Sequence, residues 1–385
     1  MWSEIIESMF FEHISAELIL FFILYGVTGV VPLLAALYLL LRRGNAIAPG
    51  VTPPVRLHRW AASFFAVVVL AHVWWLLFYI YSGDQHSVGF LVLAMVDCAL
   101  LFTTFAGTLL AMLQDRRRSV WPALAAMIPF VVLGVAMMAN PNKLLIQIIA
   151  AYLVLLGLLF TAYMVVAIRQ YERWLNDNYA DLENKKVWLS QAVSLVCMLL
   201  FILYVLATDM ILIWFVHIIE LVLVGLLLWR VETLPQLENS SMESAIFASA
   251  PEPAQENNHP TRKRQPLTIP TNIEQLLDER CVGTQLYLQH DLSLLQLAQA
   301  LGINRFYLSQ YFSRQGTTYN AYINDLRINH FMRLYRESAA AQQSITAQQL
   351  ASDSGYRSYS TFGLAFKQRT GQSVTAWMRS TGAHL

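Results

Sequence analysis

The sequence predicts an all-α protein, in which a bundle of seven transmembrane helices precedes a soluble all-helical domain with two helix-turn-helix units. Hydrophobic residues make up 56% of the 385 residues and charged residues only 13%, whereas charged residues usually approach a quarter of a soluble protein. The apolar residues are concentrated in 16–230, and 231–385 resembles a linker followed by a soluble domain. Within that second part, a ten-residue pattern occurs twice.

Seven segments are long and apolar enough to cross a bilayer, which requires about 20 residues of helix because lipid offers no partners to backbone groups. They lie near residues 16–41, 60–81, 88–112, 121–139, 144–168, 187–207 and 210–229. Only the short connection Ala207-Thr208-Asp209 separates the last two. Residues 1–15 carry acids where a secretory signal carries a basic region, so we expect the first span to remain in the mature protein.

The distribution of Lys and Arg predicts the orientation, because cytoplasmic loops retain these residues. Alternate loops are basic and contain Arg42, Arg43, Arg56, Arg59, Arg116 to Arg118, Arg169, Arg173, Lys185 and Lys186. In the intervening loops the only Lys or Arg is Lys143. We therefore expect a multi-pass protein of the bacterial inner membrane, with residues 1–15 outside and the C-terminal domain in the cytoplasm.

Four ionisable residues fall within predicted spans, where such groups are costly and often functional. They are His72, Asp97, His217 and Glu220. One interpretation is a sensor pocket for an unknown signal ligand, a proton or a metal ion. The other is interhelical hydrogen bonding that only fixes packing. A retinal protein is excluded because residues 210–229 contain no lysine for the Schiff base.

The chain lacks the sequence patterns of common catalytic sites. It contains no HExxH, GxSxG or Walker motif, and its three cysteines are widely separated, with no CxxC pair or zinc-ligand spacing. We therefore expect a protein that is not an enzyme and needs no cofactor or bound metal.

Residues 231–270 are rich in Pro, Ser, Asn, Gln and Glu and show no apolar periodicity, which predicts a flexible cytoplasmic linker. Forty such residues would span a root-mean-square distance of about 35 Å. The basic run Arg262-Lys263-Arg264 could contact phosphates, lipid headgroups or solvent.

The repeated pattern within 271–385 predicts two copies of one helical unit. Ser293 to Gly302 recurs as Thr346 to Gly355, with all matched positions 53 residues apart. In each copy a Ser or Thr can cap a helix reciprocally with a Gln three residues later, and a Gly can end that helix. A turn and a second helix follow. This is the plan of a helix-turn-helix motif, so we place two such units at about 293–315 and 346–370.

The soluble part is basic and therefore suits a polyanionic partner. From Arg262 to the C-terminus, thirteen basic residues oppose seven acidic ones, a net charge of +6. We expect the partner to be double-stranded DNA.

Residues 271–385 resemble the DNA-binding domain of AraC-type transcription regulators. The matching residues of the first unit are Leu297-Ala298, Gly302, Tyr307-Leu308-Ser309, Phe312, Gly316, Tyr322-Ile323 and Leu326-Arg327. Those of the second unit are Ile345, Leu350-Ala351, Gly355-Tyr356, Ser358, Phe362, Phe366-Lys367, Gly371, Trp377 and Arg379. The sequence departs from the family at Val374, where proline is usual, and at Gly363 and Leu364, where polar or basic residues are common.

The resemblance implies two recognition helices, joined by one long helix, in successive major-groove segments. The expected groove contacts are Arg305, Phe306, Ser309, Gln310, Ser313, Arg314, Tyr359, Ser360 and Gly363. The expected phosphate contacts are Arg357, Ser358, Lys367 and Arg369. Gly363 and Leu364 predict weaker base discrimination by the second unit.

These observations together predict a transcription regulator anchored in the lipid bilayer, which couples a membrane or external signal to promoter binding. Homodimerisation, clustering or altered access to DNA could carry the signal across the linker. Two alternatives remain: a membrane receptor or transporter with an accessory C-terminal domain, and a helix-turn-helix domain that binds another protein instead of DNA.

Overall fold

The computed structural model describes residues 16–41, 44–81, 88–183, 185–206, 210–237, 272–343 and 346–382, and within these ranges its regular elements are helices. The chain forms two compact units, Met1–Arg169 with Val187–Ser240, and Gln170–Lys186 with Ser241–Leu385. The predicted external segment 1–15, the arginines at 42 and 43, and Ile345 lie outside the described residues, as does the linker from 238 to 271, including Arg262-Lys263-Arg264.

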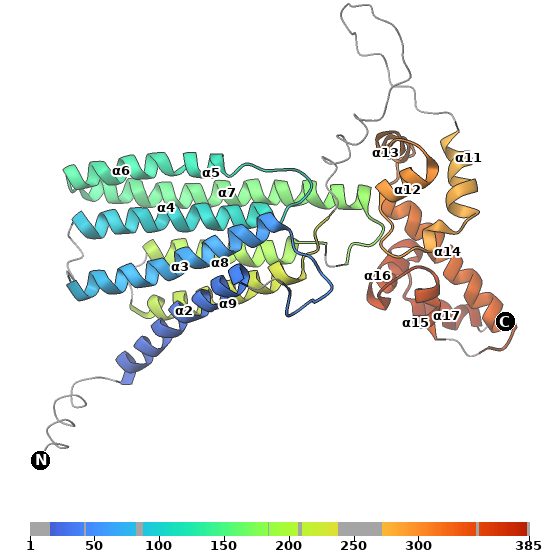
Figure 1. Cartoon of the computed structure of the whole chain (residues 1–385), viewed down its shortest axis with the longest axis horizontal. Coiled ribbons are helices and arrows are strands. Elements are labelled where there is room, and N and C mark those ends of the chain that lie inside the picture. Colours follow the sequence, from blue (N-terminus) through green and yellow to red (C-terminus); the bar gives the residue numbers. More distant parts are fainter. Residues whose placement is uncertain are drawn as a thin grey trace, which may run out of the picture. The chain divides into compact units, whose positions relative to one another are not determined.

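The first unit is a bundle of long apolar helices (Figure 1). In order they are α2 (Ala16–Leu41), α3 (Val55–Tyr81), α4 (Val88–Ala111), α5 (Trp121–Ala125), α6 (Met127–Ala139), α7 (Lys143–Asn178), α8 (Trp188–Leu206) and α9 (Met210–Thr233). Many large apolar side chains face outward, among them Leu34 and Leu40 at 59% and 65% exposure. Apolar surface of this kind suits a lipid environment and is rare on soluble monomers.

Six stretches of the described residues, with α5 and α6 counted together, are long and apolar enough to cross a membrane, whereas α8 contributes only the shorter stretch Trp188–Leu203. Contacts between loops nevertheless indicate that α8 runs from one end of the bundle to the other. The Gln114 side chain donates to the Pro235 carbonyl at 3.0 Å, and the Gln236 amide donates to the Thr52 carbonyl at 2.8 Å. The chain after α4 and the chain after α9 therefore lie at the same end of the bundle. An even number of crossings must separate them, which α5–α6, α7, α8 and α9 supply.

Two boundaries of the bundle differ from the sequence prediction. Helix α7 continues ten residues past the predicted end at 168, to Asn178. At the other boundary, residues 231–237 were assigned to the linker, but α9 extends to Thr233, and Leu234 and Leu237 are then buried. The start of the predicted linker is thus packed against the first unit.

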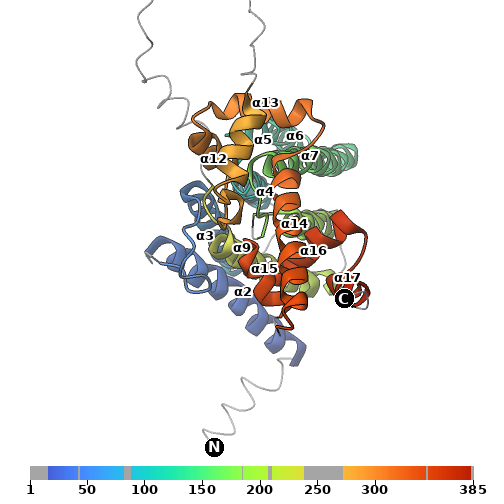
Figure 2. The ribbon, with the colours of Figure 1, turned by 90° about the vertical axis from the view of Figure 1, so that its right-hand side faces the viewer.

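The second unit contains the two predicted helix-turn-helix motifs on either side of a long helix, as both views show (Figures 1 and 2). Its elements are α11 (Ile273–Leu277), η1 (Asp278–Val282), η2 (Leu286–Leu288), α12 (Leu294–Leu301), α13 (Arg305–Arg314), α14 (Tyr319–Ala340), α15 (Ala347–Asp353), α16 (Tyr359–Thr370) and α17 (Val374–Gly382). The pairs α12–α13 and α15–α16 are the two motifs, and α14 connects them. Residues Gln170–Lys186 belong to the same unit.

The predicted capping box forms completely in the first motif and only in part in the second. Ser293 Oγ accepts from the Gln296 amide, and Gln296 Oε1 accepts from the Ser293 amide at 3.0 Å. In the second motif Thr346 accepts from the Gln349 amide at 3.2 Å, but the Gln349 side chain donates to Asp353 at 2.9 Å. The first motif has Ala300 at the position of Asp353, so this competing acceptor is absent there.

Arg327 of α14 connects the two motifs from a buried position. Its side chain is 1% exposed, and it donates to the Tyr287 and Gln289 carbonyls at 2.7 Å each. Its guanidinium also lies 5.4 Å from the ring centroid of Tyr356, which precedes α16. A single side chain therefore holds the segment before the first motif and the turn of the second motif.

We expect Arg327→Met to lower the free energy of unfolding of the second unit by about 3 kcal/mol, because two buried carbonyls lose their donors. Hydrogen exchange of amides 286–292 in the full-length protein would measure the loss. Arg336→Met, at an exposed position on the same helix, is the matched control. Equal protection of these amides in both variants would contradict this role of Arg327.

The two repeat glycines provide a second test, because both have positive φ but different surroundings. Gly302 has φ +73°, and an added Cβ would meet only Arg280 Nη1, at 3.5 Å. Gly355 has φ +87°, and an added Cβ would lie 2.8 Å from the Leu288 carbonyl oxygen. We expect Gly302→Ala to cost about 1 kcal/mol of stability and Gly355→Ala at least about twice that. Equal losses in thermal unfolding would show that the close approach at Gly355 is unimportant.

Candidate functional site

Helix α13 has one buried and one accessible face. Asn304 caps its first turn by accepting from the Phe306 amide at 2.7 Å, and Leu308 and Phe312 are buried, as the sequence predicts. On the accessible side Phe306 is 50% exposed, Ser313 and Arg314 are exposed, and Ser309 and Gln310 are half-buried. Gln310 Oε1 is itself buried and has no hydrogen-bond partner among the described residues. This face offers an exposed ring and an exposed guanidinium to a ligand, and the half-buried Gln310 lies between them.

Helix α16 has the same arrangement but a less polar accessible face. Phe362 and Phe366 are buried, while Tyr359, Ser360 and Lys367 are exposed. An added Cβ at Gly363 would meet nothing within 4 Å, and the neighbouring Leu364 is 55% exposed. The middle of this face therefore presents little hydrogen-bonding capacity. Such a face suits the expectation of weaker discrimination by the second motif.

Ser358 has a local role that the sequence analysis did not predict. Its hydroxyl caps α16 by accepting from the Thr361 amide at 3.5 Å, and it also pairs with the Ser360 hydroxyl at 2.7 Å. A phosphate contact by this hydroxyl would compete with both interactions.

Three predicted contact residues with guanidinium groups are already engaged with protein acceptors. Arg357 pairs with Asp291 at 2.6 Å, Arg369 pairs with Asp325 at 2.5 Å, and Arg305 donates to Asn178. Burial raises the pKa of Asp325, and the neighbouring Arg369 opposes that shift. Ion pairs at such exposed positions contribute little stability, so phosphate groups could replace them.

Polar groups on α14 and packed against it have pKa values that are shifted by burial. Burial lowers the pKa of the Arg327 guanidinium and raises that of the Tyr356 hydroxyl. Burial and the nearby Arg333 lower the pKa of His330, whose Nδ1 lies 3.0 Å from the Tyr287 hydroxyl. A neutral His330 fits this site, which already contains the buried charge of Arg327.

Three of the four ionisable residues predicted as a sensor pocket lie together in the bundle. His72 Nε2 is 3.7 Å from Glu220 Oε2, and the rings of His72 and His217 are 6.1 Å apart between centroids. Asp97 of α4 accepts from the indole of Trp75, which lies one turn after His72 on α3, at 3.1 Å. This polar cluster therefore draws residues from α3 and α9, and Asp97 is linked to it through α3.

Two further members of this cluster, both on α2, were not predicted from the sequence. Thr28 Oγ1 lies 3.0 Å from His72 Nε2, and the Tyr25 hydroxyl donates to the His72 carbonyl at 2.7 Å. Hydroxyl residues are common in membrane helices, so neither carried a signal by itself. Buried carboxylate oxygens of Asp97 and Glu220 have no partner among the described residues. In the same part of the chain, no three His, Cys, Asp or Glu residues are placed to hold a metal ion.

Comparison with known proteins bears on the second unit. Residues 297–380 match the family model of a helix-turn-helix domain. The match begins within α12 and ends within α17, so it includes both motifs and the connecting helix. Neither the curated proteins nor the solved structures gave a significant match to the chain.

Proposed function

We propose that this chain, whose C-terminal domain is an AraC-type helix-turn-helix domain, is a membrane-anchored transcription regulator that couples a membrane or external signal to sequence-specific promoter binding. The observation that carries the proposal is the presence of two accessible recognition helices on a basic domain that follows a bundle of apolar helices. The bundle is proposed to lie in a bacterial inner membrane with the DNA-binding domain in the cytoplasm.

The connecting helix α14 gives each recognition helix its own packing site. Phe312 of α13 packs against Tyr319 at the start of α14, with ring centroids 6.0 Å apart. Phe362 of α16 packs against Phe331 near the middle of α14, with ring centroids 4.5 Å apart. The two recognition helices are thus held apart on one helix, and we propose that they enter successive major-groove segments.

The polar cluster of the bundle is proposed to detect the signal. Among the described residues, the buried oxygens Asp97 Oδ1 and Glu220 Oε1 have no hydrogen-bond partner, whereas buried acceptors usually have one. A bound proton or a small hydrogen-bond donor would supply the missing partner. Binding would shift the population of bundle states if its affinity differed between them.

We expect Gln310→Ala to weaken operator binding by about tenfold and to relax base preference, because an amide can pair with a base edge. Lys367→Ala should weaken binding about equally for all sequences and reduce the salt dependence, because it removes a phosphate contact. The full-length protein in nanodiscs would be incubated with genomic fragments at two salt concentrations, and recovered fragments sequenced. Arg336→Ala removes an exposed charge outside both recognition helices and serves as control. Binding without an enriched motif would contradict the proposal.

We expect Glu220→Gln and Asp97→Asn to change promoter output on the order of tenfold, equivalent to about 1.4 kcal/mol on a two-state equilibrium. Each substitution removes a titratable buried group at nearly constant size. A transcriptional reporter, read at several external pH values, would measure the effect. Thr161→Val alters a hydroxyl that bonds within its own helix and serves as control. Wild-type output at equal protein level would favour a packing role.

A further inference from the structure

Residues 178–183 and Lys185, at the end of helix α7 and directly after it, pack into the DNA-binding domain and form what we call the docking segment. Tyr179 forms an antiparallel bridge with Ser293, and the Ala180 amide donates to the Leu292 carbonyl at 3.4 Å. Ala180 is 2% exposed and belongs to the same buried cluster as Leu297, Leu308 and other core residues of the first motif. The segment therefore occupies a formed site on the domain.

Side chains of α14 bind the backbone of this segment. Asn320 Nδ2 donates to the Tyr179 and Ala180 carbonyls at 3.0 and 2.7 Å. Asn324 Nδ2 also donates to the Ala180 carbonyl, at 3.3 Å. Two asparagines one helical turn apart thus fix the position of the segment along the connecting helix.

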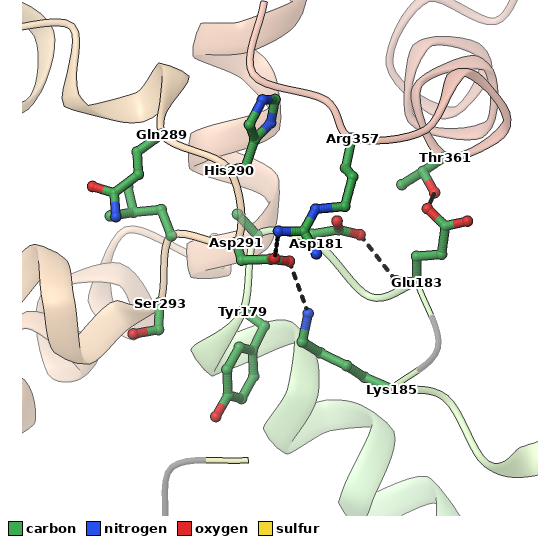
Figure 3. Close-up of polar contacts among 12 residues, drawn as sticks. Tyr179, Asp181, Glu183, Lys185, Gln289, His290, Asp291, Ser293, Arg357 and Thr361 are labelled. Atoms are coloured by element: carbon green, nitrogen blue, oxygen red, sulfur yellow. Dashed lines mark hydrogen bonds and ion pairs between the residues drawn. The ribbon is translucent and has the colours of Figure 1, made fainter. Parts of the chain in front are cut away.

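From this position the segment reaches the first turn of both recognition helices. Arg305, the first residue of α13, donates to Asn178 Oδ1. Thr361, near the start of α16, donates to Glu183 Oε2 at 3.0 Å (Figure 3). Asp181 Oδ1 accepts from the Glu183 amide at 2.9 Å and so shapes the turn that directs Glu183 toward α16.

A chain of charges connects the same segment with the second motif. Lys185 Nζ lies 3.3 Å from Asp291 Oδ1, and Asp291 Oδ2 lies 2.6 Å from Arg357 Nη2 (Figure 3). Arg357 is a predicted phosphate contact. Its partner Asp291 is therefore shared with the segment that follows α7.

We infer that the docking segment is an intramolecular ligand of the DNA-reading surface, so that docking of this segment and binding of DNA exclude each other. The inference rests on the proposed function. The N-terminal turn of a recognition helix enters the major groove. Asn178 contacts that turn in the first motif, and Glu183 contacts it in the second motif. The carboxylate of Glu183 would also repel DNA phosphates.

The position of the segment in the chain gives the exclusion a regulatory use. Helix α7 is continuous from Lys143 to Asn178, so the docking segment directly extends a membrane-spanning helix. The contacts made by the side chains of Asn178, Glu183 and Lys185 are single hydrogen bonds and a partly exposed ion pair, which are weak enough to break reversibly. A bundle state that displaces the end of α7 releases the DNA-reading surface.

A reversible cross-link tests the exclusion directly. Glu183→Cys with Thr361→Cys places two thiols where the side chains now share a hydrogen bond, and neither residue is a predicted DNA contact. In full-length protein in nanodiscs, the pair would be joined by a short bis-methanethiosulfonate reagent. We expect the joined form to bind operator DNA at least about tenfold more weakly, reductant to restore binding, and DNA to slow the joining reaction. Each single-cysteine variant, treated identically, controls for the native thiols.

A second variant tests the opposite direction. Ala180→Glu introduces a carboxylate that the buried site cannot accept, so the segment should leave the domain. We expect operator affinity to rise by about tenfold relative to wild type. Asp177→Asn changes a charge at an exposed position beside the segment and should leave affinity unchanged.

The outcomes separate the inference from the proposed function. Equal operator affinity of joined and reduced protein, with joining unaffected by DNA, would overturn the exclusion and leave the regulator proposal intact. Absence of sequence-specific binding in both forms and in the wild type would refute the regulator proposal and the inference together.

Discussion

The geometry of the DNA-binding domain depends on the buried guanidinium of Arg327. A charge removed from water is tolerated only when its hydrogen bonds are satisfied, and the Tyr287 and Gln289 carbonyls supply those bonds. These carbonyls precede the first motif, whereas Tyr356, which lies over the guanidinium, precedes α16. One side chain of α14 therefore joins the segment before the first motif to the turn of the second motif. The absence of a side chain at Gly355 is part of the same arrangement, because a Cβ there would lie 3.0 Å from Arg327 Nε.

Features that depend on local pattern could be predicted from the sequence. The apolar spans, the Ser293 capping box, the left-handed Gly302 and the buried faces of both recognition helices follow from residue type and spacing, and the structure has them all. The second capping box was predicted by the same reasoning but is incomplete, because Asp353 one turn later competes for the Gln349 side chain. Spacing defines which partners are available, and the neighbouring residues decide between them.

The docking segment could not be predicted from the sequence, because its contacts are made by backbone carbonyls and a small side chain, which occur in every protein. Asn320 and Asn324 bind backbone carbonyls, and Ala180 fits its site because it is small. The extension of α7 had no signal either, since its last residues are polar and lie beyond the apolar span. In the bundle, Tyr25 and Thr28 join His72 only because α2 and α3 pack side by side. Such sites form only when helices pack together in the folded protein, and they produce no periodic pattern in the sequence.

The predicted linker makes weak docking sufficient for regulation. The linker predicted from the sequence, shortened by residues 231–237 that pack with the bundle, would keep the domain within a few tens of ångströms of its own docking segment, at an effective concentration on the order of millimolar. Contacts as weak as those of Asn178, Glu183 and Lys185 can then be occupied without DNA. Because operator binding competes with an intramolecular ligand, a small change at the end of α7 alters the apparent affinity for DNA. The linker therefore needs to transmit no force, since it only keeps the domain close while the continuous α7 helix carries the conformational change.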